Sequence, residues 1–158
     1  DDCFFAENEI HIRQPNIENI IPSHQDNFYF RFKNPKALTC YVFLTNQNRN
    51  SGGLGFLEQK INSLIETHQS SSSIGFSSFV EEKEKLANKF KYPKTAQGDV
   101  IFHHCTTFHR ADSNLDNSPS LAASIRIFSS GCLDISEELH KKYIKNLNFN
   151  RNEYKNYS

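Results

Sequence analysis

Apolar and polar residues alternate with a period of two in several segments, a pattern typical of β-strands that bury one face. The clearest example is residues 9–14, where Ile10 and Ile12 share one face. Residues 37–45 (ALTCYVFLT) carry apolar side chains on both faces, which predicts a strand covered on both sides. Aromatic runs and turn signals predict four further strands. These strands span residues 27–32, 54–57, 100–104 and 121–128.

Few segments have the pattern of a helix. Residues 79–90 (FVEEKEKLANKF) are charged on one side, and residues 135–146 start at Ser136, a good N-cap residue, with acids in the first turn. Polar loops are expected at 46–53 and 69–73, the second of them mobile. Many strands, few helices and no β-α-β alternation predict a mainly β domain, a sandwich or a barrel.

Composition narrows the class of protein. At 158 residues the chain has the length of one domain, and its 14 Phe and 6 Tyr supply apolar surface although hydrophobic residues make up only 37%. Eighteen basic and eighteen acidic residues cancel, so no overall field favours nucleic acid or an anionic membrane. No apolar run reaches the roughly 20 residues of a membrane helix. We therefore expect neither a nucleic-acid nor a membrane partner.

The cysteines and the missing methionine add two expectations. The four cysteines, Cys3, Cys40, Cys105 and Cys132, show no C-x-x-C spacing, which predicts reduced thiols in a cytoplasmic protein. The chain contains no methionine and starts without a secretory signal pattern. We therefore expect a sequence that is incomplete at its N-terminus.

Two short segments carry candidate metal ligands. His24-Gln25-Asp26 would project two ligands from one face of a strand, and His109 follows late in the chain. Two imidazoles and one carboxylate form the facial triad that holds non-haem Fe(II) and leaves positions open for oxygen chemistry. Taken alone, the early triple is also typical of a surface loop. His103, His104 and His109 are also compatible with core-edge positions, and periodicity does not choose among them.

A family resemblance joins the two segments. Residues 98–114 (GDVIFHHCTTFHRADSN) resemble the late segment of the phytanoyl-CoA dioxygenase family of Fe(II)/2-oxoglutarate oxygenases, where a Gly-Asp turn opens a strand and H-x-x-x-x-H follows. In a subset of that family the segment reads nearly H-C-x-x-x-H-R-A-D-x-N, as residues 104–114 do. Residues 22–29 (PSHQDNFY) resemble the family's P-x-H-Q-D-x-x-Y, and residues 37–45 and 50–57 resemble the segments between.

The resemblance spans about residues 10–128 and implies a double-stranded β-helix, a cupin-like jelly roll with a few flanking helices. Its core would cover residues 1–134, with a helix and a polar tail of the same domain at 135–158. The implied Fe(II) ligands are His24, Asp26 and His109, with His104 in a supporting place and His103 in the core.

The resemblance also implies a reaction. Because related halogenases lack a carboxylate at the position of Asp26, it implies a hydroxylase that uses 2-oxoglutarate and O2 and releases succinate and CO2. The implied substrate is a small molecule or an acyl or lipid-like compound.

One departure from the family concerns 2-oxoglutarate. The family usually places an arginine about eleven residues after the distal histidine, where this chain has Ser120. Arg126 is the only arginine on that predicted strand and is equally compatible with a surface position. The candidate contacts to 2-oxoglutarate are Arg126, Ser120 and Thr39. Three alternatives stay open: a non-catalytic metal-binding relative, a cupin-type enzyme that does not use 2-oxoglutarate, and a purely structural β-domain.

Overall fold

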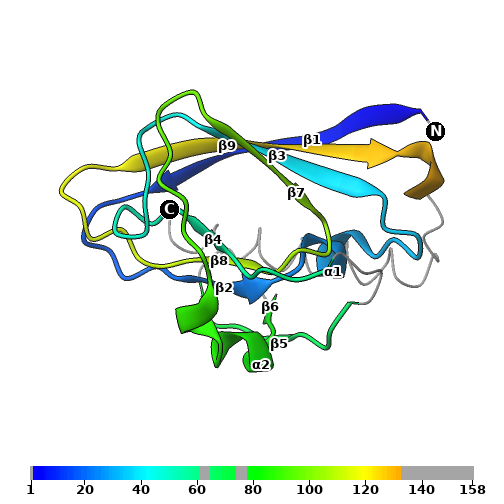
Figure 1. The fold of residues 1–158 in the computed structure, drawn as a ribbon, viewed down its shortest axis with the longest axis horizontal. Helices are drawn as coiled ribbons and strands as arrows, with labels where there is room; N and C mark the ends of the chain where they lie inside the picture. The colour runs from blue at the N-terminus through cyan, green and yellow to red at the C-terminus, as the bar shows by residue number, and fades with distance from the viewer. Residues whose placement is uncertain (1, 61–64, 74–77, 133–158) are drawn as a thin grey trace, which may run out of the picture.

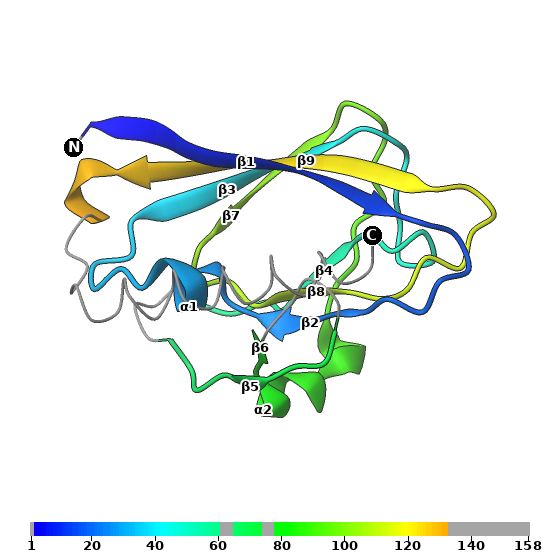
Figure 2. The ribbon, with the colours of Figure 1, turned by 180° about the vertical axis from the view of Figure 1, so that it is seen from behind.

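Two antiparallel sheets face each other in the computed structural model, which describes residues 2–60, 65–73 and 78–132 (Figures 1 and 2). The four-stranded sheet has the order β1 (Cys3–Arg13), β9 (Ser120–Ser129), β3 (Ala37–Phe43) and β7 (Val100–His104). The three-stranded sheet has the order β2 (Ile21–His24), β8 (His109–Ala111) and β4 (Leu54–Phe56). From β2 to β4 and from β7 to β9, successive strands alternate between the two sheets, which confirms the predicted jelly roll.

Most strand predictions are confirmed. The strand predicted at 9–14 is longer and forms β1, while β3, β4, β7 and β9 match the predictions to within two residues. Gly98, at φ 92°, forms the predicted turn before β7, a conformation that glycine adopts without steric cost. A short hairpin of β5 (Gln69–Ser70) and β6 (Ser78–Phe79) replaces part of the loop predicted at 69–73.

The strand predicted at 27–32 is wrong, because this aromatic segment begins with helix α1 (Asp26–Phe30). The Asn27 side chain closes the turn by donating to the Phe32 carbonyl and accepting from the Phe32 N–H. Arg31 ends the helix in the left-handed region at φ 62°. Phe30 and Phe32 pack with Ala37 and the buried Cys105 and Cys132, so local hydrogen bonds and packing override the strand propensity of the aromatic residues.

The helix predicted at 79–90 is interrupted. Only α2 (Glu81–Glu84) and a 3-10 turn, η1 (Ala87–Lys89), form there, because Leu86 at φ −99° and ψ 16° departs from helical geometry. A second 3-10 turn, η2 (Ser130–Cys132), follows β9. The helix predicted at 135–146 lies outside the described residues.

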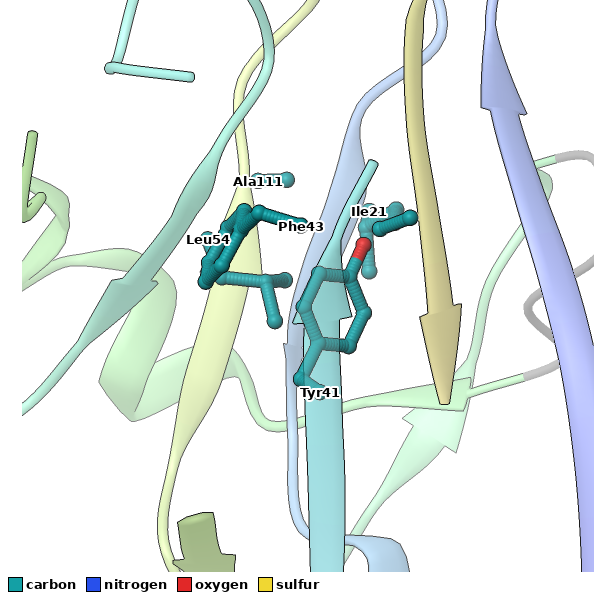
Figure 3. Close-up of a cluster of buried hydrophobic side chains, with 6 residues drawn as sticks. Ile21, Tyr41, Phe43, Leu54 and Ala111 are labelled. Carbon is teal, nitrogen blue, oxygen red and sulfur yellow. The ribbon is translucent and has the colours of Figure 1, made fainter. Parts of the chain in front are cut away.

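A hydrophobic cluster joins the two sheets. Ile21, Leu54 and Ala111 of the three-stranded sheet meet Tyr41, Phe43 and Ala122 of the four-stranded sheet. Figure 3 shows five of these side chains converging between the strands. Truncating a buried aromatic residue usually costs several kcal/mol, so Phe43→Ala is expected to lower the free energy of unfolding by about 3–5 kcal/mol. This cluster fixes the distance between the sheets, and thereby the place of the residues that project between them.

The outer face of the four-stranded sheet is apolar and partly exposed. Ile10, Ile12, Leu38, Val100 and Phe102 lie on it, and Phe102 is 61% exposed. The prediction that strand 37–45 is covered on both sides is therefore wrong for the described residues: buried and more exposed positions alternate along β3. None of the described helices has the length and apolar character needed to cross a membrane.

Candidate metal centre

The sheet register brings His24 and His109 together. His24 ends β2 and His109 begins β8, and the two residues are direct partners in the antiparallel pairing. Their ring centroids lie 4.3 Å apart. Asp26 joins them from the first position of α1, not from a shared strand face as the sequence suggests. The three predicted ligands therefore converge although Asp26 belongs to a different element.

Gln25 explains how this turn from strand to helix is held. Its side-chain amide donates to the Thr106 carbonyl at 2.8 Å, and its side-chain oxygen accepts from the Glu66 N–H at 2.9 Å. On the other side of Asp26, Asn27 donates its backbone N–H to the Cys105 carbonyl at 2.8 Å. These bonds tie both sides of Asp26 to neighbouring segments, so the position of Asp26 does not depend on strand pairing.

One ligand atom from each of His24, Asp26 and His109 lies within 4.8 Å of the other two. Asp26 Oδ1 is 3.8 Å from His24 Nε2 and 3.6 Å from His109 Nε2. His24 Nδ1 donates to the Pro22 carbonyl at 2.8 Å, and His109 Nδ1 donates to the Thr107 carbonyl at 3.0 Å. Because these bonds place the proton on Nδ1, they present each unprotonated Nε2 toward Asp26, as metal coordination requires.

Electrostatics give His24 and Asp26 the protonation that a metal needs. Burial, followed by the neighbouring His109, lowers the pKa of His24 to about 3, so this imidazole is neutral near pH 7. Burial alone would raise the pKa of Asp26, but His109, His103 and Arg126 outweigh burial and lower it below the ordinary range. A neutral histidine beside an ionised carboxylate in a buried site suits Fe(II).

The second carboxylate oxygen of Asp26 faces the four-stranded sheet. Thr39 on β3 donates its hydroxyl to Asp26 Oδ2 at 2.7 Å, and both residues are buried. His103 on β7 places Nδ1 4.0 Å from the same oxygen. Thr39, predicted as a contact to 2-oxoglutarate, thus binds a predicted metal ligand in the structure.

The two neighbouring histidines lie on opposite faces of β7. His104 points away from Asp26's side of β7 and its Nδ1 pairs with the Thr106 hydroxyl at 2.8 Å, so it gives no visible support to the ligands. His103 is buried as expected and lies beside His109, with ring centroids 4.5 Å apart, and its Nδ1 makes no hydrogen bond to any residue that the structure describes. Because side chains alternate along a strand, the sequence predicts that His103 and His104 lie on opposite faces of β7, but it does not show which face points toward the metal ligands.

Arg126 lies on the inner face of β9. It is the register partner of the buried Thr39, and burial and the nearby Asp26 act on its pKa in opposite directions, with a net rise. Its guanidinium donates to Glu9 at 2.9 Å and to the Ser124 hydroxyl at 3.1 Å. Within the described part of the chain its Nε makes no hydrogen bond, and the Glu7 carboxylate lies 4.0 Å from it. Arg126 is thus a half-buried residue between the inner face of β9 and the carboxylates at the edge of the sheet.

Ser120 lies at the other end of β9, and its hydroxyl donates to the Ser51 carbonyl at 2.8 Å. Directly opposite on β1 is Arg13, a buried arginine that the sequence did not single out. Arg13 donates to the backbone carbonyls of Asn19 and Asp112 and packs against Gly52. A buried arginine in an otherwise exposed strand is recognisable only after the strand has been paired.

Solved structures share this fold. EvdO2 from Micromonospora carbonacea var. aurantiaca matches with a TM-score of 0.71 and 19% identity over 85% of this chain and 56% of its own. EvdO2 complexed with 2-oxoglutarate matches with a TM-score of 0.69 and 19% identity, over 81% of this chain and 52% of its own. EctD from S. alaskensis with 2-oxoglutarate and 5-hydroxyectoine matches with a TM-score of 0.61 and 16% identity, over 84% and 46%. This chain thus spans about half the length of these structures.

A search of curated protein sequences gave no significant match. The family comparison gave a clear one: the model for phytanoyl-CoA dioxygenase (PhyH) matches residues 4–119, which include the two metal-ligand segments and, except for Cys3, all of the described strands from β1 to β8. The chain therefore belongs to the phytanoyl-CoA dioxygenase family.

Proposed function

We propose that this protein is a non-haem Fe(II)/2-oxoglutarate-dependent dioxygenase that hydroxylates a small organic or acyl/lipid-like substrate and releases succinate and CO2. The buried convergence of His24, Asp26 and His109 carries the proposal. Family membership and solved neighbours in complex with 2-oxoglutarate support it. The four cysteines form no disulfide, which supports a reducing, cytoplasmic location.

The three ligands would hold Fe(II), which when bound supplies the O2-dependent oxidation chemistry of the family. The imidazoles offer Nε2, and Asp26 offers the anionic oxygen that faces both rings. The carboxylate is also why hydroxylation is the proposed outcome, since halogenases of related type lack it. All three side chains are buried, which would limit the access of bulk water to a metal held there.

Arg126 would bind the distal carboxylate of 2-oxoglutarate. It is on the inner face of β9, its charge acts on Asp26, and within the described residues its Nε makes no hydrogen bond, although Glu7 lies 4.0 Å away. The hydroxyls of Thr39 and Ser120 are both engaged, with Asp26 and with the Ser51 carbonyl. An arginine can bind a carboxylate through two parallel hydrogen bonds, which a serine or threonine cannot.

One observation favours a second candidate, a metal-binding relative that does not use 2-oxoglutarate. Ser120 stands where the family usually has its arginine, and Arg126 is already paired with Glu9. Such a protein would bind metal through the same three ligands and form no succinate.

The two candidates differ in a product assay. The chain is incubated with Fe(II), O2, ascorbate as reductant and 2-oxoglutarate, and succinate is measured without added substrate. The dioxygenase predicts succinate that depends on Fe(II) and disappears in Asp26→Ala. Metal binding without any succinate above the Asp26→Ala background would contradict it and favour the second candidate.

A further inference from the structure

The two oxygens of the Asp26 carboxylate have different surroundings. Oδ1 faces the Nε2 atoms of His24 and His109, at 3.8 and 3.6 Å. Oδ2 faces away from them and accepts the Thr39 hydroxyl at 2.7 Å, with His103 Nδ1 4.0 Å away. The carboxylate is thus divided between a side that meets the other ligands and a side that meets the four-stranded sheet.

Strand pairing places the two neighbours of Oδ2, Thr39 and His103, next to each other on the sheet. Thr39 of β3 and His103 of β7 are direct register partners, so their side chains project side by side from the inner face of the sheet. Both are buried, and His103 Nδ1 has no hydrogen-bond partner within the described part of the chain. A buried donor without a partner is costly, and Asp26 Oδ2 is an anionic acceptor within reach of a small side-chain movement.

We propose that Thr39 and His103 are positioning residues that hold Asp26 as a ligand through Oδ1 alone. The inference rests on the proposed metal site and goes beyond it. If the carboxylate bound the metal through both oxygens, the protein would occupy four of the six octahedral positions instead of three. If Oδ2 is held by the Thr39 hydroxyl and, after a small movement, by His103, three positions would stay open, the number that a bidentate 2-oxo acid and O2 need together. Neither residue contacts the reacting atoms.

Matched substitutions separate this role from packing. Thr39→Val removes the hydroxyl at equal size, whereas Thr39→Ser keeps it. His103→Leu removes the imidazole donor, whereas His103→Asn keeps an N–H near the position of Nδ1. His104→Leu serves as a control, because this neighbouring histidine pairs with Thr106 and lies on the other face of β7.

The test is titration of the full metal-free chain with Co(II), which reports affinity and, through its visible ligand-field bands, coordination number. Thr39→Val and His103→Leu are each expected to weaken Co(II) binding by about 10-fold or more and to change the band shape. Thr39→Ser, His103→Asn and His104→Leu are expected to retain wild-type bands and nearly wild-type affinity. Because both residues act on one oxygen, the effects of Thr39→Val and His103→Leu should not add in the double variant.

Two results would overturn the proposal. Wild-type affinity and bands in Thr39→Val and His103→Leu would show that Oδ2 needs no holding. Equal losses in the conservative and non-conservative variants would show that only packing matters. In both cases the wild-type chain still binds Co(II), so the proposed function is not contradicted. A wild-type chain that binds no Co(II) would contradict the proposed function itself.

Discussion

The three-stranded sheet and strand β9 lie on opposite sides of the barrel and follow the family pattern to different degrees. β2 and β8 carry His24 and His109 in direct register, within segments that match the family's motifs closely. β9 instead has Ser120 at the usual arginine position, and its only arginine, Arg126, lies six residues further along. The metal-ligand segments thus follow the family's motifs, whereas the proposed contact to 2-oxoglutarate departs from them, so metal binding and 2-oxoglutarate binding can be tested separately.

The largest expected effect lies on the metal side. Asp26→Ala and His109→Ala should each weaken Fe(II) or Co(II) binding by at least about 100-fold, since second-layer substitutions alone cost 10- to 100-fold. Equilibrium dialysis of the metal against each variant measures this loss. His104→Ala is the control and should bind as wild type; if it lost metal as strongly as His109→Ala, the assignment of the distal ligand would be wrong.

Acid should destabilise the metal-free chain through the same buried groups. Burial lowers the pKa of His24 and of His103 to about 3, whereas in the unfolded chain each imidazole takes up a proton near pH 6.5. Between these values the unfolded state binds more protons, so the free energy of unfolding falls as the pH drops. Each histidine contributes about 1.4 kcal/mol per pH unit in this window.

Urea denaturation between pH 6.5 and 4.5, with a chelator present, measures this dependence. His103→Leu should remove about half of the slope that the two histidines produce. The lowered pKa of Asp26 adds stability that is present above the unfolded carboxyl pKa and is lost only at still lower pH. A free energy of unfolding that stays constant over this range would contradict the buried, neutral state of both imidazoles.

On the co-substrate side, Arg126→Ala should weaken 2-oxoglutarate binding by about 10- to 100-fold, the effect of losing a charge-assisted hydrogen bond worth about 1.5–3 kcal/mol. Metal affinity should change far less. Calorimetric titration of 2-oxoglutarate into the Co(II)-loaded chain separates the two. Arg49→Ala, which removes a half-exposed arginine paired with Asp112, is the matched control. Unchanged binding in Arg126→Ala would leave Arg13 as the buried arginine to examine.

The smallest effect is expected at Ser120. Ser120→Ala removes the hydrogen bond to the Ser51 carbonyl and should lower the free energy of unfolding by about 1 kcal/mol, with no change in 2-oxoglutarate affinity. Thermal unfolding and the same calorimetric titration check both parts. A clear loss of 2-oxoglutarate affinity would mean that Ser120 has taken over the place of the family's arginine.

Period-two patterns predicted a mainly β domain, because alternation along a strand is a local property. The jelly roll and the ligand set His24, Asp26 and His109 were implied by the family resemblance, and the structure brings these three residues together. The strand prediction failed at residues 27–32, where the Asn27 side chain and the burial of Phe30 and Phe32 favour a helix over the strand that aromatic residues suggest. Local propensity cannot anticipate such tertiary packing.

The residues that contact the predicted metal ligands could not be predicted from the sequence, for a different reason. Thr39 meets Asp26, and His103 takes a place beside His109, only because β3 pairs with β7 in one register and faces the opposite sheet. A shift by one residue would turn both side chains outward. Arg13 and Arg126 likewise acquire their burial from the pairing of β1 with β9.

The most direct test of the account is an anaerobic titration of the Fe(II)-loaded chain with 2-oxoglutarate, followed in the visible range. A 2-oxo acid that chelates ferrous iron gives a weak metal-to-ligand charge-transfer band. The account predicts a saturable band in the wild-type chain, its absence in Asp26→Ala, and a higher 2-oxoglutarate requirement in Arg126→Ala. Iron binding by the wild-type chain with no band at any 2-oxoglutarate concentration would contradict it.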